Sequence, residues 1–135
     1  MGKVLERIRL TNVFDPSKSE EIDAVIGTGA TMLVLPQDLV DRLGLRKIRE
    51  AKVRYANREV RPKGIYGIVA LQIQGRIGNF DVLAEVPGSE ALVGQIVLEE
   101  LDLVIHPATK KLTANPESPD MPMVEILSSS PSTPH

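Results

Sequence analysis

Near the start of the chain, residues 27–31 (GTGAT) place small and hydroxyl-bearing side chains between two apolar runs, AVI at 24–26 and MLVL at 32–35. Glycine permits tight backbone turns, so the simplest interpretation is a turn between two strands. A phosphate-binding loop is disfavoured, because the later glycine and lysine of such loops are absent and an apolar run follows instead of a long helix. The block itself carries no carboxylate, imidazole or thiol.

Other chemistry-bearing residues are sparse. The chain has no cysteine, which excludes disulfides, thiol catalysis and thiolate metal sites. Its two histidines, His106 and His135, lie far apart, and His106 precedes a proline in an expected turn. No pairing of histidines or acids has the spacing of a metal-binding motif. We therefore expect neither a metal nor a cofactor.

Overall charge limits the possible partners. The 135 residues include 16 basic and 18 acidic side chains, for a net charge of −2. A nucleic-acid-binding domain usually has a basic excess, and the basic residues between 42 and 54 alternate with acidic and apolar ones. No apolar run approaches the roughly 20 residues that span a bilayer. These features predict a cytoplasmic protein with no nucleic-acid or membrane partner.

The elements that must position the 27–31 block are mostly strands. Alternating or β-branched apolar residues predict strands at 3–10, 22–26, 31–35, 51–55, 65–74, 77–86, 92–94, 103–105 and 111–113. Short helices are expected at 36–43 and 96–101, the first with proline at its start and Gly44 after its end. Many short strands with regular turns favour an all-β sandwich or closed barrel with one or two short helices.

Turn-forming residues and the chain end complete this outline. Turns are predicted at residues 15–17 (DPS) and around Asn57, which tolerates positive φ. Residues 115–135 hold five of the ten prolines and a serine-rich end. This composition predicts a domain over residues 1–114 and a mostly unpacked tail over 115–135, in which residues 123–127 (MVEIL) could add one strand.

Two motifs together point to a family. The segment from Ala24 to Pro36 resembles the active-site loop of retropepsin-like (retroviral-type) aspartic proteases, in which Asp-Thr/Ser-Gly-Ala-Thr/Ser lies between apolar strands. A second family hallmark, an apolar pair and a glycine before a short helix, matches Leu92-Val93-Gly94. The resemblance covers residues 4–112 and implies the family fold and aspartic-type endopeptidase activity.

The resemblance also implies roles and partners. In this family two carboxylates share one proton and activate water, and a chain this short supplies one loop, so a homodimer would be needed. The resemblance implies that Thr28 cross-links the two loops, that Gly29 allows their turn, and that Ala30 and Thr31 line a cleft for an extended peptide. The flap over that peptide would comprise Tyr55, Ala56, Asn57 and Arg58, with Tyr55 equally able to be a strand residue over the core.

The chain departs from the family at one decisive position, since Gly27 stands where the family has its catalytic aspartate. Glycine cannot hold a proton or polarise water. Asp23 lies about 13 Å away along an extended strand, and Asp38 falls on the expected helix surface, so neither is a good replacement.

Three origins of Gly27 stay open, namely a natural pseudoprotease, an engineered inactive version, and a sequencing or cloning change. The function classes are an aspartic protease disarmed at residue 27, a peptide-binding dimer that never cleaves, and a monomeric β-domain without a cleft.

Overall fold

The computed structural model describes residues 3–128, and it confirms the all-β prediction. Its strands are β1 (Val4–Asn12), β2 (Asp15–Ile26), β3 (Leu33–Pro36), β4 (Arg46–Arg54), β5 (Val60–Ile73), β6 (Arg76–Glu85), β7 (Leu92–Val93), β8 (Leu103–His106) and β9 (Lys111–Ala114). Its helices are α1 (Gln37–Arg42) and α2 (Gln95–Leu101). Within the described residues, no helix is long and apolar enough to cross a membrane.

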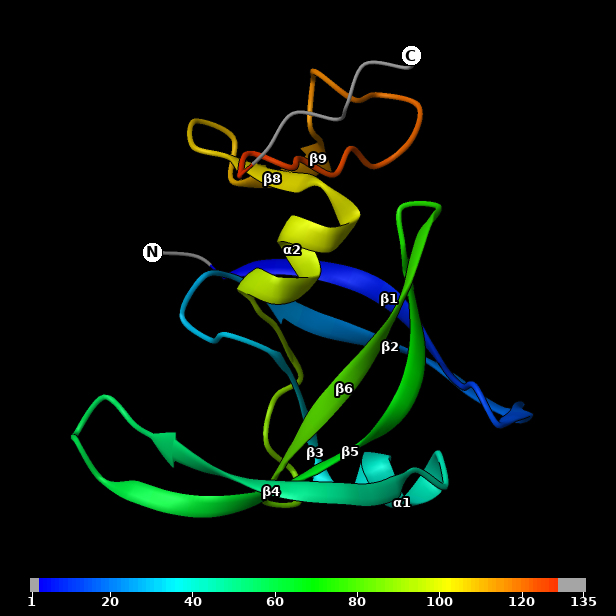
Figure 1. Cartoon of the computed structure of the whole chain (residues 1–135), viewed down its shortest axis with the longest axis vertical. Coiled ribbons are helices and arrows are strands. Elements are labelled where there is room, and N and C mark those ends of the chain that lie inside the picture. The colour runs from blue at the N-terminus through cyan, green and yellow to red at the C-terminus, as the bar shows by residue number, and fades with distance from the viewer. Residues whose placement is uncertain (1–2, 129–135) are drawn as a thin grey trace.

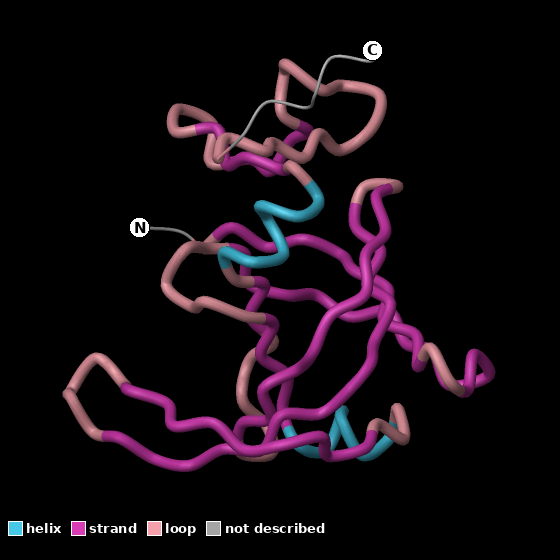
Figure 2. The backbone as a smooth tube through the Cα atoms, viewed as in Figure 1, coloured by secondary structure: helices cyan, strands magenta, loops and turns pink. Residues whose placement is uncertain are grey.

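Seven of the strands form one sheet in the order β1-β2-β7-β3-β6-β5-β4, and a further pairing of β1 with β5 closes six of them into a ring. The closed-barrel prediction is therefore confirmed. The β4–β5 hairpin extends beyond this ring, and its tip projects from the same side of the molecule as the loop after β2 (Figure 1). Strands β8 and β9 form a separate hairpin next to α2 (Figure 2).

The alternation of side chains along β3 and β6 separates two apolar clusters. Leu33 and Leu35 of β3 point into the main core with Val82 of β6, and all three are almost fully buried. Val34 and Leu83 point to the opposite face. There they form a smaller cluster beneath the β4–β5 hairpin. A strand buried on both faces explains the unbroken apolar run at 32–35.

One predicted turn is placed differently by the structure, and another is confirmed. The turn predicted at 15–17 is wrong: the reversal occurs at residues 13–14, and Asp15 already pairs with Asn12 across β1 and β2. The side-chain amide of Asn12 donates to the carbonyl oxygens of Leu43 and Gly44 and its oxygen accepts from Phe14 N–H, which fixes the earlier turn. The turn predicted around Asn57 is confirmed at residues 56–58 of the β4–β5 hairpin, where Arg58 and not Asn57 adopts positive φ (69°).

The chain after β9 remains attached over its first residues. Asn115 and Ser118 both donate side-chain hydrogen bonds to the Asp102 carboxylate, and the buried Arg76 guanidinium donates to the Ser118 carbonyl. The Ser118 and Asn115 hydrogen bonds, with the Met123 N–H, lower the pKa of Asp102. Residues 123–127 form no strand with the described chain, and their side chains are exposed. The domain boundary at 114/115 stays a prediction.

Candidate active site

The GTGAT block forms an irregular loop between β2 and β3. Thr28, Gly29 and Thr31 are exposed, whereas Gly27 and Ala30 are partly buried. Both flanking strands lie in the closed ring, so the barrel fixes where the loop begins and ends. The segment is thus a loop between two strands of the ring, and the role that the resemblance implies for it stays a prediction.

Backbone hydrogen bonds hold this loop to the second family hallmark. The Gly27 N–H donates to the Val93 carbonyl (3.1 Å), which continues the short parallel pairing of β2 with β7. The N–H groups of Gln95 and Ile96, at the start of α2, donate to the carbonyls of Ala30 and Thr31 at 2.9 Å each. Most side chains of the loop are thus exposed, whereas its backbone is hydrogen-bonded near both ends to β7 and α2.

Gly94 is required by the close approach of the loop. A Cβ atom built at Gly94 would lie 2.5 Å from the Ala30 carbonyl oxygen and 2.6 Å from that of Met32, closer than real carbon atoms come. By contrast, a Cβ at Gly27 would meet only the Gly29 nitrogen, at 4.0 Å, and φ there does not lie in the left-handed region. The loop therefore needs glycine at 94 but not at 27.

A cleft of about 480 Å³ lies between the loop and the β4–β5 hairpin. Its apolar floor includes Val34, Leu83 and Leu92. Its opposite wall is the hairpin, whose Ala51 and Val53 are packed against the floor cluster. The hairpin therefore lies across the cleft from the loop, and its role as a flap stays a prediction.

Tyr55, at the start of the hairpin tip, belongs to a partly buried polar cluster with Lys63 and Glu85. The Tyr55 hydroxyl donates to the Glu85 carboxylate (2.6 Å), and the Lys63 ammonium pairs with the same carboxylate at 2.9 Å. Burial raises the pKa of Glu85, but the hydrogen bonds from Tyr55 and Lys63 outweigh it, so that the pKa is lowered overall. The same bonds raise the pKa values of Tyr55 and Lys63. Glu85 is thus held as a carboxylate at neutral pH.

The structure brings together some of the predicted site residues and separates others. Five predicted residues line the cleft, namely Gly29, Ala30, Thr31, Tyr55 and Ala56. Asn57 instead lines an adjoining hollow of about 550 Å³, and Gly27, Thr28 and Arg58 line neither space. The roles assigned to all nine residues stay predictions.

Sequence reasoning missed the cleft floor and the polar cluster. The alternation in residues 32–35 indicates that Met32 and Val34 share a face, and this signal could have identified part of the floor. Nothing in the sequence singles out Glu85 or Lys63, which are 22 residues apart and meet only because β5 pairs with β6.

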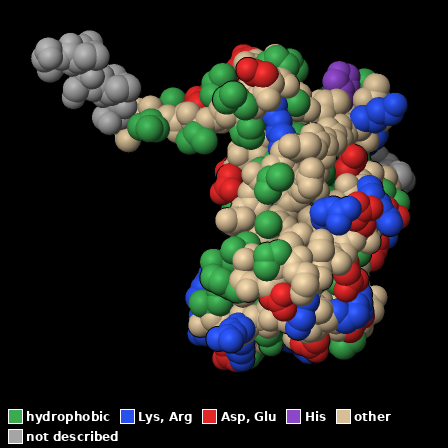
Figure 3. All heavy atoms as spheres, turned by 90° about the vertical axis from the view of Figure 1, so that its right-hand side faces the viewer, with side chains coloured by type: hydrophobic (Ala, Val, Ile, Leu, Met, Phe, Trp, Pro, Cys, Tyr) green, Lys and Arg blue, Asp and Glu red, His purple; other side chains and the backbone are tan. Residues whose placement is uncertain are grey.

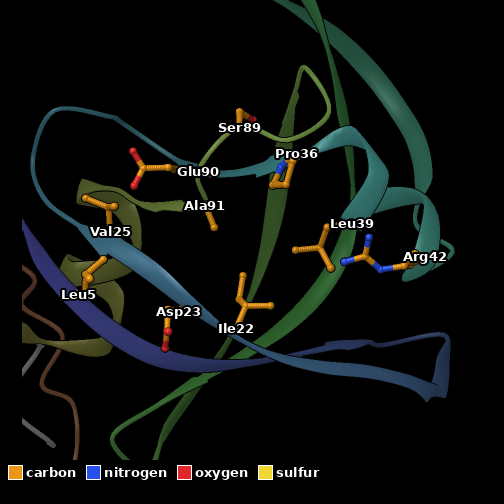
Figure 4. A pocket seen from close by; sticks show the side chains of 10 residues that line it. All are labelled: Leu5, Ile22, Asp23, Val25, Pro36, Leu39, Arg42, Ser89, Glu90 and Ala91. Atoms are coloured by element: carbon orange, nitrogen blue, oxygen red, sulfur yellow. The ribbon is translucent and has the colours of Figure 1, made fainter.

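The two other acids considered as replacements lie outside the cleft. Asp23 pairs with Arg7 on β1 (3.3 Å) and lines a separate hollow of about 320 Å³ (Figure 4). Asp38 accepts a hydrogen bond from Gly88 N–H and pairs with Arg42. Across residues 3–128, no group of three potential metal-binding side chains is present.

Comparison with known proteins agrees with this geometry. A family model described as aspartyl protease matches residues 16–121, which include the loop, the hairpin, the cleft floor and α2. No curated protein matches the chain. Since the match covers well over half of the sequence and the fold is the closed, mainly β barrel that the family motifs imply, the chain belongs to the aspartyl protease family, of the retropepsin-like type.

Proposed function

We propose that two copies of this chain form a two-fold dimer with the cleft of an aspartic endopeptidase, and that Gly27 leaves this dimer able to bind an extended peptide but unable to hydrolyse it. One observation carries the proposal: the loop is anchored, and a Cβ atom at Gly27, the first atom of the aspartate side chain that the family chemistry requires, would meet nothing closer than the Gly29 nitrogen at 4.0 Å.

The chemistry follows from what an aspartate at residue 27 would supply. Two carboxylates brought close across a two-fold axis cannot both ionise, a situation for which the aspartic protease dyad is the standard example. The ionised one takes a proton from water as the water attacks the peptide carbonyl, and the protonated one donates to the carbonyl oxygen. Glycine provides neither group.

Peptide binding needs no carboxylate at residue 27. An extended peptide between the flap and the loop can add as a strand, with its backbone bonded to protein backbone and its alternate side chains in pockets. The apolar floor beneath the flap is suited to an aliphatic side chain of such a peptide. A dimer that binds without cleaving is therefore consistent with the chain as it stands.

The test compares the Gly27 protein with Gly27→Asp and Gly27→Asn, which has nearly the same shape but no acid. Each is incubated with a mixed peptide library from about pH 4 to 7, and cleavage is followed by mass spectrometry. We expect cleavage by Gly27→Asp alone, blocked by a transition-state inhibitor of aspartic proteases. Sedimentation velocity should show a dimer in all three.

Other outcomes would redirect the assignment. Cleavage by the Gly27 or Gly27→Asn protein would require a different catalytic group. Folded, dimeric Gly27→Asp protein that cleaves nothing would favour a binding module whose site no longer supports hydrolysis. A monomer in all three versions would contradict the dimeric site itself, since one copy supplies only one loop.

A further inference from the structure

The cleft and the adjoining hollow are divided by a small set of shared residues. The two spaces have volumes of about 480 and 550 Å³, and both are lined by Val34, Tyr55, Glu85 and Leu92. Of these four, only Glu85 carries a charge. It lies at the end of β6 and on the same face as Leu83 of the cleft floor, because side chains two residues apart share a face of a strand.

The Glu85 side chain is fixed from two directions. Tyr55, where β4 gives way to the flap tip, binds one carboxylate oxygen, and Lys63 on β5 binds the other. The side chains of Lys63 and Glu85 are each only 19% exposed. A charged group with both oxygens engaged and little access to water cannot swing aside without leaving its partners unpaired.

The two spaces differ in the side chains that they offer. On the cleft side, the lining is mainly apolar and includes Ala30, Met32, Val53 and Leu83, together with the cationic Lys52 and Arg54 of the β4–β5 hairpin. On the other side it is mostly polar and includes Asn57, Glu59, Arg61 and Lys63. Side chains at positions i and i+2 of an extended peptide lie on one face, about 6.6 to 6.8 Å apart. The cleft and the adjoining hollow therefore suit the side chains of two such peptide residues.

We infer that Glu85, held in place by Tyr55 and Lys63, is a specificity-determining residue. It closes one end of the apolar part of the cleft, which we call the apolar chamber. The inference rests on the proposed peptide-binding function. The cleft then selects extended peptides with an aliphatic side chain of about leucine or methionine size in the apolar chamber and a polar side chain two residues away. A larger aromatic side chain would have to press on the paired carboxylate and strip its remaining water.

The experiment measures side-chain preference at the apolar position. The Gly27 protein binds fluorescent peptides that differ only there (Val, Leu, Met, Phe or Trp), and Gly27→Asp cleaves the same set if it is active. Each background carries Glu85→Ala, Glu85→Gln or the control Glu21→Ala, whose exposed carboxylate pairs with Arg9 outside both spaces. Thermal unfolding confirms that every variant is folded.

We expect the preference for Leu over Phe to fall about tenfold in Glu85→Ala, about threefold in Glu85→Gln, and not at all in Glu21→Ala. An unchanged preference in folded Glu85→Ala would overturn the inference, and so would an equal fall in the control. If Glu85→Ala does not fold, an unchanged preference in Glu85→Gln overturns it instead. Absence of binding and cleavage in every version, control included, contradicts the proposed function and removes the inference with it.

Discussion

The GTGAT loop and the tip of the β4–β5 hairpin, the proposed flap, are both exposed, but they are held in different ways. Four backbone hydrogen bonds anchor the loop region. The N–H groups of Val25 and Gly27 donate to the segment before α2, and two N–H groups at the start of α2 donate to the loop. The flap tip has two local backbone bonds, both between its own residues, at Tyr55 N–H to Glu59 and Arg58 N–H to Tyr55. Its link to the barrel is the side-chain cluster centred on Glu85.

This difference matches the two roles that we propose, a fixed loop that carries residue 27 and a hairpin that covers the peptide. A loop that must present a reacting group needs its backbone fixed by the barrel, and anchoring by neighbouring elements achieves this. The proposed flap must open to admit a peptide, so its stability should lie at the low end for the fold. The C-terminal segment differs from both, because its apolar side chains, including Val124, Ile126 and Leu127, are exposed and do not pack on the domain (Figure 3).

The largest effect is expected at the anchor of the loop. Gly94→Ala places a Cβ against two backbone carbonyls, and the loop or α2 must move. Overpacking of this kind costs about 1–3 kcal/mol, measurable as a lower free energy of unfolding in urea. Gly29→Ala is the matched control, because its Cβ meets nothing within 4 Å and should change stability by less than about 0.5 kcal/mol. Equal losses in both variants would mean that close approach at Gly94 is not what fixes the loop.

A smaller effect is expected where the proposed flap contacts Glu85. Tyr55→Phe removes the hydrogen bond to Glu85 while keeping the ring, at a cost of about 0.5–1.5 kcal/mol. Hydrogen exchange should accelerate at the amides of Tyr55 and Arg58 and stay unchanged at Gly27, whose amide bonds Val93. Faster exchange at Gly27 as well would show that flap and loop open as one unit.

The same hydrogen bonds predict a pH dependence of the flap. The pKa of Glu85 is lowered on folding, so its contribution to stability is present above the ordinary glutamate pKa of about 4.3 and is lost as the pH falls through the lowered folded value. Flap amide exchange, corrected for its intrinsic pH dependence, should therefore increase below about pH 4. In Glu85→Gln this increase should be absent; its persistence would assign the effect to another group.

The smallest effect is expected at the flap tip itself. Arg58 has a φ of 69°, a conformation that costs a non-glycine residue about 1 kcal/mol. Arg58→Gly relieves this strain but increases the entropy of the unfolded chain, so the net change should be within about 0.5 kcal/mol. Thermal unfolding checks this, and a loss above 1 kcal/mol would indicate that the Arg58 side chain makes a stabilising contact.

Local patterns were sufficient for the elements and for the family. The alternation of apolar residues, the proline before α1 and Gly44 after it located most strands and both helices, because these signals act over a few residues. The turn at 15–17 failed for the opposite reason. Asn12 bonds carbonyls more than thirty residues away, and these contacts outweigh local turn propensity.

By itself, the sequence determined the all-β class, the GTGAT loop, the Leu92-Val93-Gly94 hallmark and the absence of a carboxylate at residue 27. Only the tertiary structure decided that Gly94 must be glycine, that a Cβ atom fits at residue 27, and that Glu85 meets Tyr55 and Lys63. The physical reason is that strand pairing joins residues distant in the chain. Close approach and shared burial at those junctions leave no trace in local sequence pattern.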